Sequence, residues 1–253
     1  MILYINGDSH AAGVECVNPH AWAEDDGALW GYGKGPHPDN EAASFGAVLS
    51  EMLKFQRVNQ SQGGGSNARI LRTTREWIAN NPNLLDQVFM LIQWSTWERT
   101  EWFYQNEWWQ VNASGTDHVP RELEDQYRRY IVDIDWTQAT RQAHQDIWQF
   151  HLELESLGIP HLFFNGNSHF GGGHLQNGLT VPIIADQQDW DTSYMDPYNA
   201  DGTYTNVLKN NGFQTVAPDS YHFGADAHCF WATHVLQYML NNQIVSIDEI
   251  PAD

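Results

Sequence analysis

Hydrophobic and polar positions follow two patterns along the chain, short apolar runs and longer stretches with helical spacing. The apolar runs predict five strands, the last of them from the weakest pattern, at residues 2–6, 55–60, 88–93, 161–165 and 213–216. Between them, apolar residues recur every three or four positions and predict helices at residues 44–53, 67–78, 122–157 and 225–240. Strands that alternate with helices are typical of an α/β fold with a parallel sheet covered on both faces.

The length of 253 residues fits one α/β domain that spans residues 1–253. Three stretches, near residues 20–40, 94–119 and 167–206, are longer than the connections such a scaffold needs. They are rich in Trp, Tyr, Gly and His, and two of them follow predicted strand ends. We therefore expect these stretches to form ordered loops around a functional site.

Charge excludes several classes of partner. The chain has 32 acidic residues and only 12 Lys and Arg, which gives a formal net charge of −20. Such a surface repels phosphate backbones and anionic lipids, so we expect no nucleic-acid and no membrane partner. The N-terminus lacks the basic region of a signal peptide, and no apolar run approaches the roughly 20 residues that span a bilayer. A cytoplasmic location is expected, with Cys16 and Cys229 as reduced thiols.

A serine stands where the first predicted strand ends. The apolar run breaks into Gly7-Asp8-Ser9, followed by small residues that suit a tight turn. Because ligands bind at the carboxyl edge of an open α/β sheet, Ser9 is a candidate nucleophile. Near the other end of the chain, Asp219 precedes His222 by three residues. A short turn of this kind can supply the base that takes the serine proton and the carboxylate that orients this base.

Gly7-Asp8-Ser9 near one end of the chain, with Asp219-x-x-His222 near the other, resembles the GDSL or SGNH hydrolase superfamily. The resemblance implies a three-layer α/β/α sandwich with a five-stranded parallel sheet, which is a flavodoxin-like arrangement. It also implies ester hydrolysis without a metal or organic cofactor, with Ser9, His222 and Asp219 as the catalytic triad. The pattern SN-x-x-I-x-R-T from residue 66 and the WER element from residue 97 look like an uncharacterised branch of phage type. A phage origin would imply association with the virion.

The oxyanion hole of that superfamily is matched less closely. Its second block is a glycine after the second strand, and Gly64 stands at that position in the run GGG. Its third block, Gly-x-Asn-Asp, is missing after the third strand, where Ser95 or Thr96 replaces the Asn. Asn67 can fill the same role, or it can be the N-cap of the helix that it opens. The predicted oxyanion hole therefore consists of Ser9, Gly64, Asn67 and Ser95.

Aromatic and histidine side chains in the long loops are candidates for substrate contacts. We expect Trp94 and Trp97 to line a pocket, although a Trp-rich loop that packs over the sheet would explain the same residues. His169 follows the fourth strand, where it contacts substrate or, as the alternative, belongs to a surface loop. Isolated histidines carry no metal-ligand spacing, and His144 and His151 are expected on a solvated helix face. No metal site is predicted.

The sequence thus predicts a serine hydrolase that cleaves a carboxylic ester through an acyl-enzyme. The expected substrate is a short acyl group, such as acetate, on a carbohydrate or another small molecule. The alternative is a weak or inactive member of the same fold that serves as a carbohydrate-binding or structural module. The missing third block and the 12 Trp residues motivate this alternative.

Overall fold

The computed structural model describes residues 1–20, 36–113, 119–174, 180–181, 184 and 186–245. Its centre is a five-stranded sheet in the order β2-β1-β3-β6-β9, and all four strand pairings are parallel. The strands are β1 (Ile2–Asn6), β2 (Gln56–Asn59), β3 (Val88–Trp94), β6 (His161–Asn165) and β9 (Tyr194–Met195). Counted within the sheet alone, this is the flavodoxin-like order 2-1-3-4-5.

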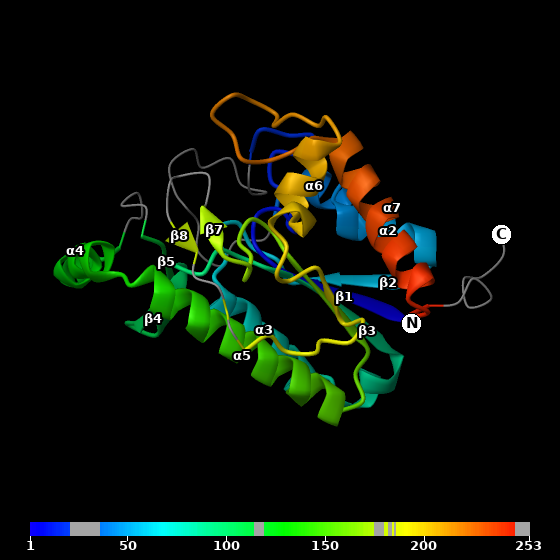
Figure 1. Ribbon diagram of the computed structural model, residues 1–253, viewed down its shortest axis with the longest axis horizontal. Coiled ribbons are helices and arrows are strands. Elements are labelled where there is room, and N and C mark those ends of the chain that lie inside the picture. Colours follow the sequence, from blue (N-terminus) through cyan, green and yellow to red (C-terminus); the bar gives the residue numbers. More distant parts are fainter. Residues whose placement is uncertain (21–35, 114–118, 175–179, 182–183, 185, 246–253) are drawn as a thin grey trace.

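Helices cover both faces of the sheet (Figure 1). On one side lie α2 (Phe45–Leu53) and α7 (Ala225–Asn241), and on the other lie α3 (Asn67–Asn80) and α5 (Trp136–Ser156). The predicted fold class, a three-layer α/β/α sandwich with a five-stranded parallel sheet, is therefore confirmed. None of the described helices is long and apolar enough to cross a membrane.

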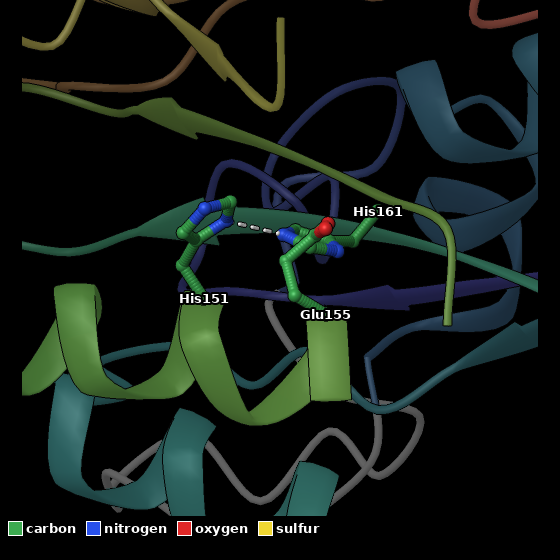
Figure 2. Close-up of side chains that lie close together, drawn as sticks. All are labelled: His151, Glu155 and His161. Atoms are coloured by element: carbon green, nitrogen blue, oxygen red, sulfur yellow. Dashed lines mark hydrogen bonds between the residues drawn. The ribbon is translucent and has the colours of Figure 1, made fainter. Parts of the chain in front are cut away.

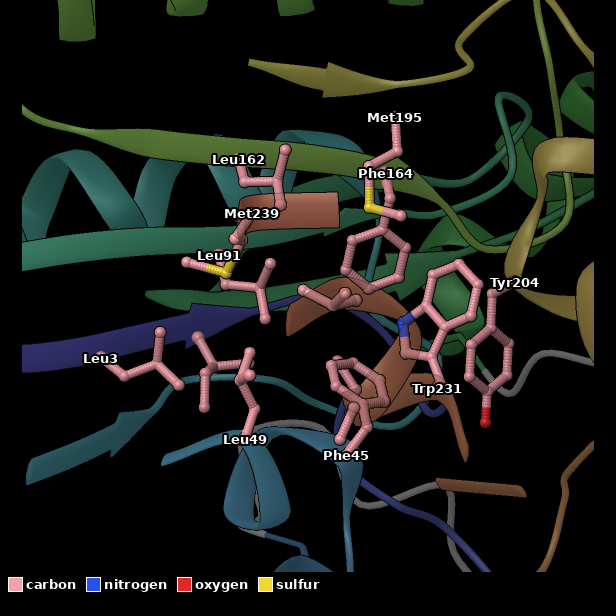
Figure 3. Close-up of a cluster of buried hydrophobic side chains, with 14 of the residues drawn as sticks. Leu3, Phe45, Leu49, Leu91, Leu162, Phe164, Met195, Tyr204, Trp231 and Met239 are labelled. Atoms are coloured by element: carbon pink, nitrogen blue, oxygen red, sulfur yellow. The ribbon is translucent and has the colours of Figure 1, made fainter. Parts of the chain in front are cut away.

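Successive side chains of the central strands enter two separate hydrophobic clusters, because neighbouring residues of a strand point to opposite faces. Leu3 and Leu91 pack with α2 and α7, in a cluster that also buries Trp231 completely (Figure 3). Tyr4 and Met90 pack with α3 and α5 on the opposite face. Every residue of β3 is buried, since this strand lies in the middle of the sheet.

The predicted helix over residues 122–157 is broken. It consists of the 3₁₀ turn η2 (Arg121–Leu123), α4 (Glu124–Asp133) and α5. The chain is extended at Ile134, and the Asp135 side chain caps α5 by accepting a hydrogen bond of 3.0 Å from the N–H of Gln138. Asp-x-x-Gln is a capping signal, so the break is encoded locally and overrides the continuous helical spacing.

The weakest predicted strand, over residues 213–216, does not join the sheet. Thr215 instead forms an isolated antiparallel bridge with Phe223. The fifth strand is β9, whose two residues are too few to show an alternating pattern.

All three long stretches contain some regular structure within the described residues. Residues 94–119 carry a hairpin of β4 (Thr100–Tyr104) and β5 (Glu107–Val111), which turns at Gln105 and Asn106, both with positive φ. Residues 167–206 include β7 (Gly173–His174), β8 (Thr180–Val181), the 3₁₀ turn η3 (Ala200–Gly202) and the start of α6 (Tyr204–Asn210). In the first stretch, residues 21–35 lie outside the described residues, and α1 (Pro38–Ala42) begins close to its end. The remaining element is the 3₁₀ helix η1 (Pro82–Gln87).

Candidate active site

Ser9 lies in a helical turn that follows β1. The carbonyl of Asp8 accepts a hydrogen bond of 3.0 Å from the N–H of Ala12, and that of Ser9 accepts one of 2.9 Å from Val14. Since β1 pairs with both β2 and β3, this turn stands where the strand order reverses, at the carboxyl edge of the sheet. Ligands of such folds bind at this edge. Ser9 itself is half-buried.

Gln93, a buried residue of β3, fixes the turn to the sheet. Its Oε1 accepts hydrogen bonds from the N–H groups of Asp8 and Ala11, at 3.1 and 3.3 Å, and its Nε2 donates to the carbonyl of Trp94 at 2.9 Å. A Cβ atom at Gly7 would lie 2.7 Å from both Ala11 Cβ and Gln93 Oε1, so a side chain at this position would displace the turn. The glycine before Asp8-Ser9 is therefore required by these contacts.

His222 is held by a carboxylate, and that carboxylate belongs to Glu15. Nδ1 of His222 lies 2.8 Å from Glu15 Oε2, which also accepts a hydrogen bond of 2.6 Å from Ser220 Oγ. The N–H of His222 donates to Ser220 Oγ at 3.0 Å. Because Nδ1 donates to the carboxylate, Nε2 carries the lone pair of the neutral imidazole. The ring of His10, which follows Ser9 in the sequence, is 5.7 Å from that of His222 between centroids.

The same contact changes the acidity of Glu15. The hydrogen bond from His222 lowers the pKa of the Glu15 carboxyl; partial burial opposes this, and the bond from Ser220 reinforces it. Glu15 therefore remains ionised over a wider acidic range than a free glutamate. A negative charge beside Nδ1 stabilises a protonated His222 and fixes the tautomer of its neutral form.

Asp219 does not occupy the predicted position on His222. Its side chain is exposed, and within the described residues no hydrogen bond or ion pair joins it to His222. Glu15 has a φ of 61°, in the left-handed region that is unusual for a non-glycine residue. In the sequence, only the proximity of Glu15 to Ser9 could have indicated this contact, because no short motif marks a carboxylate six residues after a nucleophile.

Asp8 forms a buried network with the end of β3. Its Oδ2 accepts hydrogen bonds from Ser95 Oγ at 2.9 Å and from Arg99 at 3.1 Å, and its Oδ1 accepts one from the N–H of His10 at 3.0 Å. Burial by itself would raise the pKa of the Asp8 carboxyl, but the His10 and Arg99 charges and these hydrogen bonds lower it below 3.8. Ser95 was predicted as an oxyanion donor, but its hydroxyl donates to Asp8 instead.

Asn67 is neither an N-cap nor an unpaired donor. Ser66 caps α3 by accepting a hydrogen bond of 3.2 Å from the N–H of Arg69. The Asn67 amide pairs with the backbone of Ser95, accepting from its N–H at 2.8 Å and donating to its carbonyl at 3.2 Å. The side chains of Asn67 and Ser95 thus connect α3, β3 and the Ser9 turn, and one amide hydrogen of Asn67 stays outside these two bonds.

Gly64 lies in a tight turn against the backbone before Ser9. The N–H of Gly65 donates to the carbonyl of Gln62 at 2.9 Å, and Gly64 has a φ of 73°, which favours glycine. A Cβ atom at Gly65 would be 3.2 Å from the carbonyl oxygen of Gly7, so the two turns are in contact. Within the described residues, the N–H groups of Ser9 and Gly64 have no hydrogen-bond acceptor. They are available to a ligand.

His10, the residue after Ser9, is a buried part of the site. It is 3% exposed, and its Nε2 lies 3.1 Å from the amide nitrogen of Asn167. Because that amide donates, the proton of the neutral ring is on Nδ1, which is buried without a partner among the described residues. Burial lowers the pKa of His10 to about 4, so the ring is neutral at pH 7. His10 therefore brings an unpaired donor beside Ser9.

The three residues predicted to contact substrate have low exposure, and of these Trp97 also lines the cleft described below. Trp94 is completely buried and packs edge-on against Phe163, so it belongs to the core, as the packing alternative held. Trp97 is 7% exposed and stacks on Phe170 with ring centroids 4.6 Å apart. His169 is also buried, and its carbonyl accepts a hydrogen bond from the Trp97 indole at 3.4 Å.

The predicted solvated positions of His144 and His151 are wrong. Both side chains are buried on the face of α5 that packs toward the aromatic residues of the loop after β6. His144 Nε2 lies 2.8 Å from the hydroxyl of Tyr198, and His151 contacts Trp190.

A cleft of about 770 Å³ runs between α3 and α5. Aromatic and polar side chains line it, among them Trp97, Trp102, Tyr130, Gln138, Asn67 and Arg99. The last two link its wall to the network around Asp8, since Asn67 pairs with Ser95 and Arg99 with Asp8. The cleft therefore borders the elements that hold the Ser9 turn.

Part of the chain matches a family of known sequences. Residues 32–150, slightly less than half of the chain, match the model of a family of unknown function, DUF6071. No curated protein sequence matches the chain.

Three solved structures are similar over most of this chain. A putative lipolytic protein of the G-D-S-L family from Desulfitobacterium hafniense DCB-2 is 12% identical with a TM-score of 0.44, covering 96% of this chain and 99% of its own. The psychrotrophic esterase EstA from Pseudoalteromonas sp. is 8% identical with a TM-score of 0.44, covering 95% and 97%. The acetyl xylan esterase Est2A from the rumen bacterium Butyrivibrio proteoclasticus is 11% identical with a TM-score of 0.40, covering 96% and 64%. These likenesses are too low to assign an activity to this chain.

Proposed function

We propose that the protein is a serine esterase of the SGNH type, in which Ser9 is the nucleophile, His222 the general base and Glu15 the orienting carboxylate. The observation that carries this proposal is the 2.8 Å hydrogen bond between Glu15 and Nδ1 of His222, beside the turn that presents Ser9. A carboxylate on Nδ1 leaves Nε2 as the proton acceptor that a serine nucleophile needs.

The proposed reaction is acyl transfer in two steps. Ser9 Oγ attacks the ester carbonyl while Nε2 of His222 takes the hydroxyl proton, and Glu15 stabilises the imidazolium that forms. The N–H groups of Ser9 and Gly64 bind the oxyanion of the tetrahedral intermediate. When it collapses, the C–O bond to the alcohol breaks and His222 returns the proton to the leaving oxygen. Water then attacks the acyl-serine, with His222 as base, and releases the carboxylic acid.

We further propose that the substrate is a carbohydrate that carries a short O-acyl group. The cleft between α3 and α5 supports this, because it joins aromatic side chains such as Trp102 and Tyr130 with amide and charged groups. Aromatic faces can stack on sugar rings while polar groups bind hydroxyls. A formal net charge of −20 disfavours anionic substrates such as phospholipids.

The first experiment combines turnover with labelling. Wild-type protein, Ser9→Ala and His222→Ala are incubated with p-nitrophenyl acetate and with a fluorophosphonate probe, after circular dichroism has shown that all three are folded. Wild-type turnover and labelling that both disappear in the two variants support the proposal. Equal background hydrolysis and no labelling in all three proteins would contradict it.

A second candidate function is a carbohydrate-binding module with little or no catalysis. The observation that favours it is that the Ser95 hydroxyl, a predicted oxyanion donor, donates to Asp8 instead, while Asn67 uses its oxygen and one amide hydrogen on the Ser95 backbone. Removing one donor typically lowers turnover by about 10²–10³. Saturable binding of acetylated oligosaccharides by a protein that the fluorophosphonate does not label would favour the module.

A further inference from the structure

Two histidines and a glutamate converge at the end of α5, far along the chain from Ser9. His151 and Glu155 lie one turn apart on α5, and His161 is the first residue of β6. Their side chains point toward one another (Figure 2), and one ligand atom from each lies within 4.8 Å of the others. Nδ1 of His151 and Nε2 of His161 are 2.9 Å apart. Both histidines are buried, and Glu155 is exposed.

The connection between α5 and β6 gives this arrangement a fixed backbone. Gly158 has a φ of 66°, and its N–H donates to the carbonyl of Glu155 at 3.0 Å. The N–H of Ile159 donates to the carbonyl of Leu154 at 3.0 Å. These two bonds form a Schellman motif, which ends the helix in a defined geometry. The chain therefore returns directly from the last turn of α5 to His161.

Hydrogen bonding directs the lone pair of His161 toward the other two side chains. Nδ1 of His161 lies 2.9 Å from the carbonyl of Ile159, so it carries the proton and donates it to that oxygen. Nε2 is then an acceptor that faces His151. Metal-binding histidines are typically oriented in this way, by a carbonyl or carboxylate on the second ring nitrogen.

We propose that His151, Glu155 and His161 bind a divalent transition-metal ion, with Zn²⁺ as the best match. Two imidazole nitrogens and one carboxylate oxygen are a common zinc ligand set, with water in the fourth position. Tetrahedral zinc with bonds of about 2.0–2.2 Å holds its ligand atoms about 3.3–3.5 Å apart. The two nitrogens, now 2.9 Å apart, would separate slightly to reach this spacing. The exposed Glu155 carboxylate would rotate toward them to bind the same ion.

Metal binding moves one proton within the His151 ring, and none is released. In the present arrangement, the proton between the two rings sits on His151 Nδ1, because Nε2 of His161 is the acceptor. When the ion binds, Nδ1 of His151 becomes a ligand, and the neutral ring carries its proton on Nε2 instead. The metal then occupies the space between the two lone pairs, and no oxidation or reduction is involved.

The site serves structure rather than ester hydrolysis. His161 begins β6 and pairs with Met90, whereas Ser9 follows the opposite, carboxyl end of the parallel strand β1. The ion would link the end of α5 to the start of β6. Trp148 stacks on His151 with ring centroids 5.0 Å apart and Trp190 contacts the same ring, so aromatic side chains shield the ion. The sequence predicted no metal, because the spacing H-x₃-E-x₅-H matches no short metal motif.

The test measures binding directly and needs no substrate. Full-length protein is stripped with a chelator and dialysed, then titrated with Zn²⁺ by calorimetry and with Co²⁺ by visible absorption. The variants are His151→Gln and Glu155→Gln, and the latter changes an exposed side chain that the fold does not require. The matched control, His144→Gln, removes another buried histidine of α5 that makes no contact with the cluster.

We expect one Zn²⁺ per chain and a cobalt absorption band in the wild type and in His144→Gln. Both cluster variants should weaken binding at least about tenfold, because the loss of a supporting outer-shell partner already costs about 10–100-fold. Binding that is absent from folded wild-type protein, or equal in all four proteins, would overturn the site. Ester hydrolysis that survives chelation supports the structural role, and its loss would overturn that role without affecting the ligand assignment.

Discussion

Glu15 and His222 are 207 positions apart in the sequence, yet the carboxylate of the first lies 2.8 Å from Nδ1 of the second. The contact joins the turn after the first strand to the loop before the last helix. It therefore places the carboxylate and the nucleophile of the proposed triad on one turn, six residues apart. The base alone comes from the other end of the chain.

The two candidate carboxylates can be separated by substitution. Glu15→Gln should lower kcat for p-nitrophenyl acetate by about 10²–10⁴, because the amide removes the charge that stabilises protonated His222. Asp219→Asn should change kcat less than about twofold, since an exposed substitution away from the ring alters little. The opposite ranking would return Asp219 to the role predicted from the sequence.

The Gln93 amide should control both stability and turnover. Gln93→Leu leaves the N–H groups of Asp8 and Ala11 without their acceptor, which should cost about 2–4 kcal/mol of unfolding free energy. The displaced turn should also lower kcat by about 10². Urea unfolding and ester kinetics measure the two effects.

Val235→Ala is the control for Gln93→Leu. It destabilises the buried contact of α7 with the sheet by a comparable amount and removes no hydrogen bond of the Ser9 turn. If Val235→Ala lost as much kcat as Gln93→Leu, the kinetic effect would reflect general destabilisation.

Arg99 should contribute most to the free energy of unfolding when Asp8 is ionised. The side chain of Asp8 is 1% exposed and that of Arg99 is 23% exposed. Because folding lowers the pKa of Asp8, the ionised carboxylate stabilises the folded state fully above pH 3.8. This contribution is lost as the pH falls through the lower pKa of the folded state. Arg99→Met should therefore destabilise the protein by about 2–3 kcal/mol at pH 7, less than a fully buried pair would.

The pH dependence distinguishes charge from packing at Arg99. Below the pKa of Asp8 the carboxyl is protonated in both proteins, so the stability difference between wild type and Arg99→Met should narrow. Chemical unfolding at a series of pH values, from about pH 7 down into the acid range, measures this difference. A difference that stays constant with pH would mean that the Arg99 side chain stabilises the fold through packing alone.

Trp102 tests whether the cleft between α3 and α5 holds the substrate. Trp102→Ala should raise KM for an acetylated oligosaccharide about tenfold, because stacking on one aromatic ring typically contributes about 1–2 kcal/mol. KM and kcat for p-nitrophenyl acetate should stay within about twofold. An equal effect on both substrates would place the saccharide elsewhere.

Local patterns predicted most of the fold. The strand at residues 161–165 was predicted with its observed ends, since the apolar run Leu162–Phe164 lies between a Gly-x-Pro stop and a polar loop. The fifth strand could not be predicted, because β9 has only two residues and shows no alternating pattern. Its position in the sheet depends on the path of the preceding loop.

The site was harder to read than the fold. Ser9 and His222 stand in short motifs, so their roles could be predicted from the sequence and remain predictions. Glu15 reaches His222 through a contact with no local signature in the sequence. Trp94 looks like a pocket wall by position but is buried, because β3 is the central strand. A residue at the end of a predicted strand can therefore be part of the core once the neighbouring loops fold over it.

The two outer strands of the sheet influence how copies of the chain meet. β9 is only two residues long, and β2 presents the polar side chains of Gln56, Arg57 and Asn59. Unpaired strand edges are templates for intermolecular β-pairing, and short or charged edges discourage it. A fold whose borders are built this way resists sheet extension and amyloid-like stacking, so concentrated solutions of the native protein should stay free of fibrils.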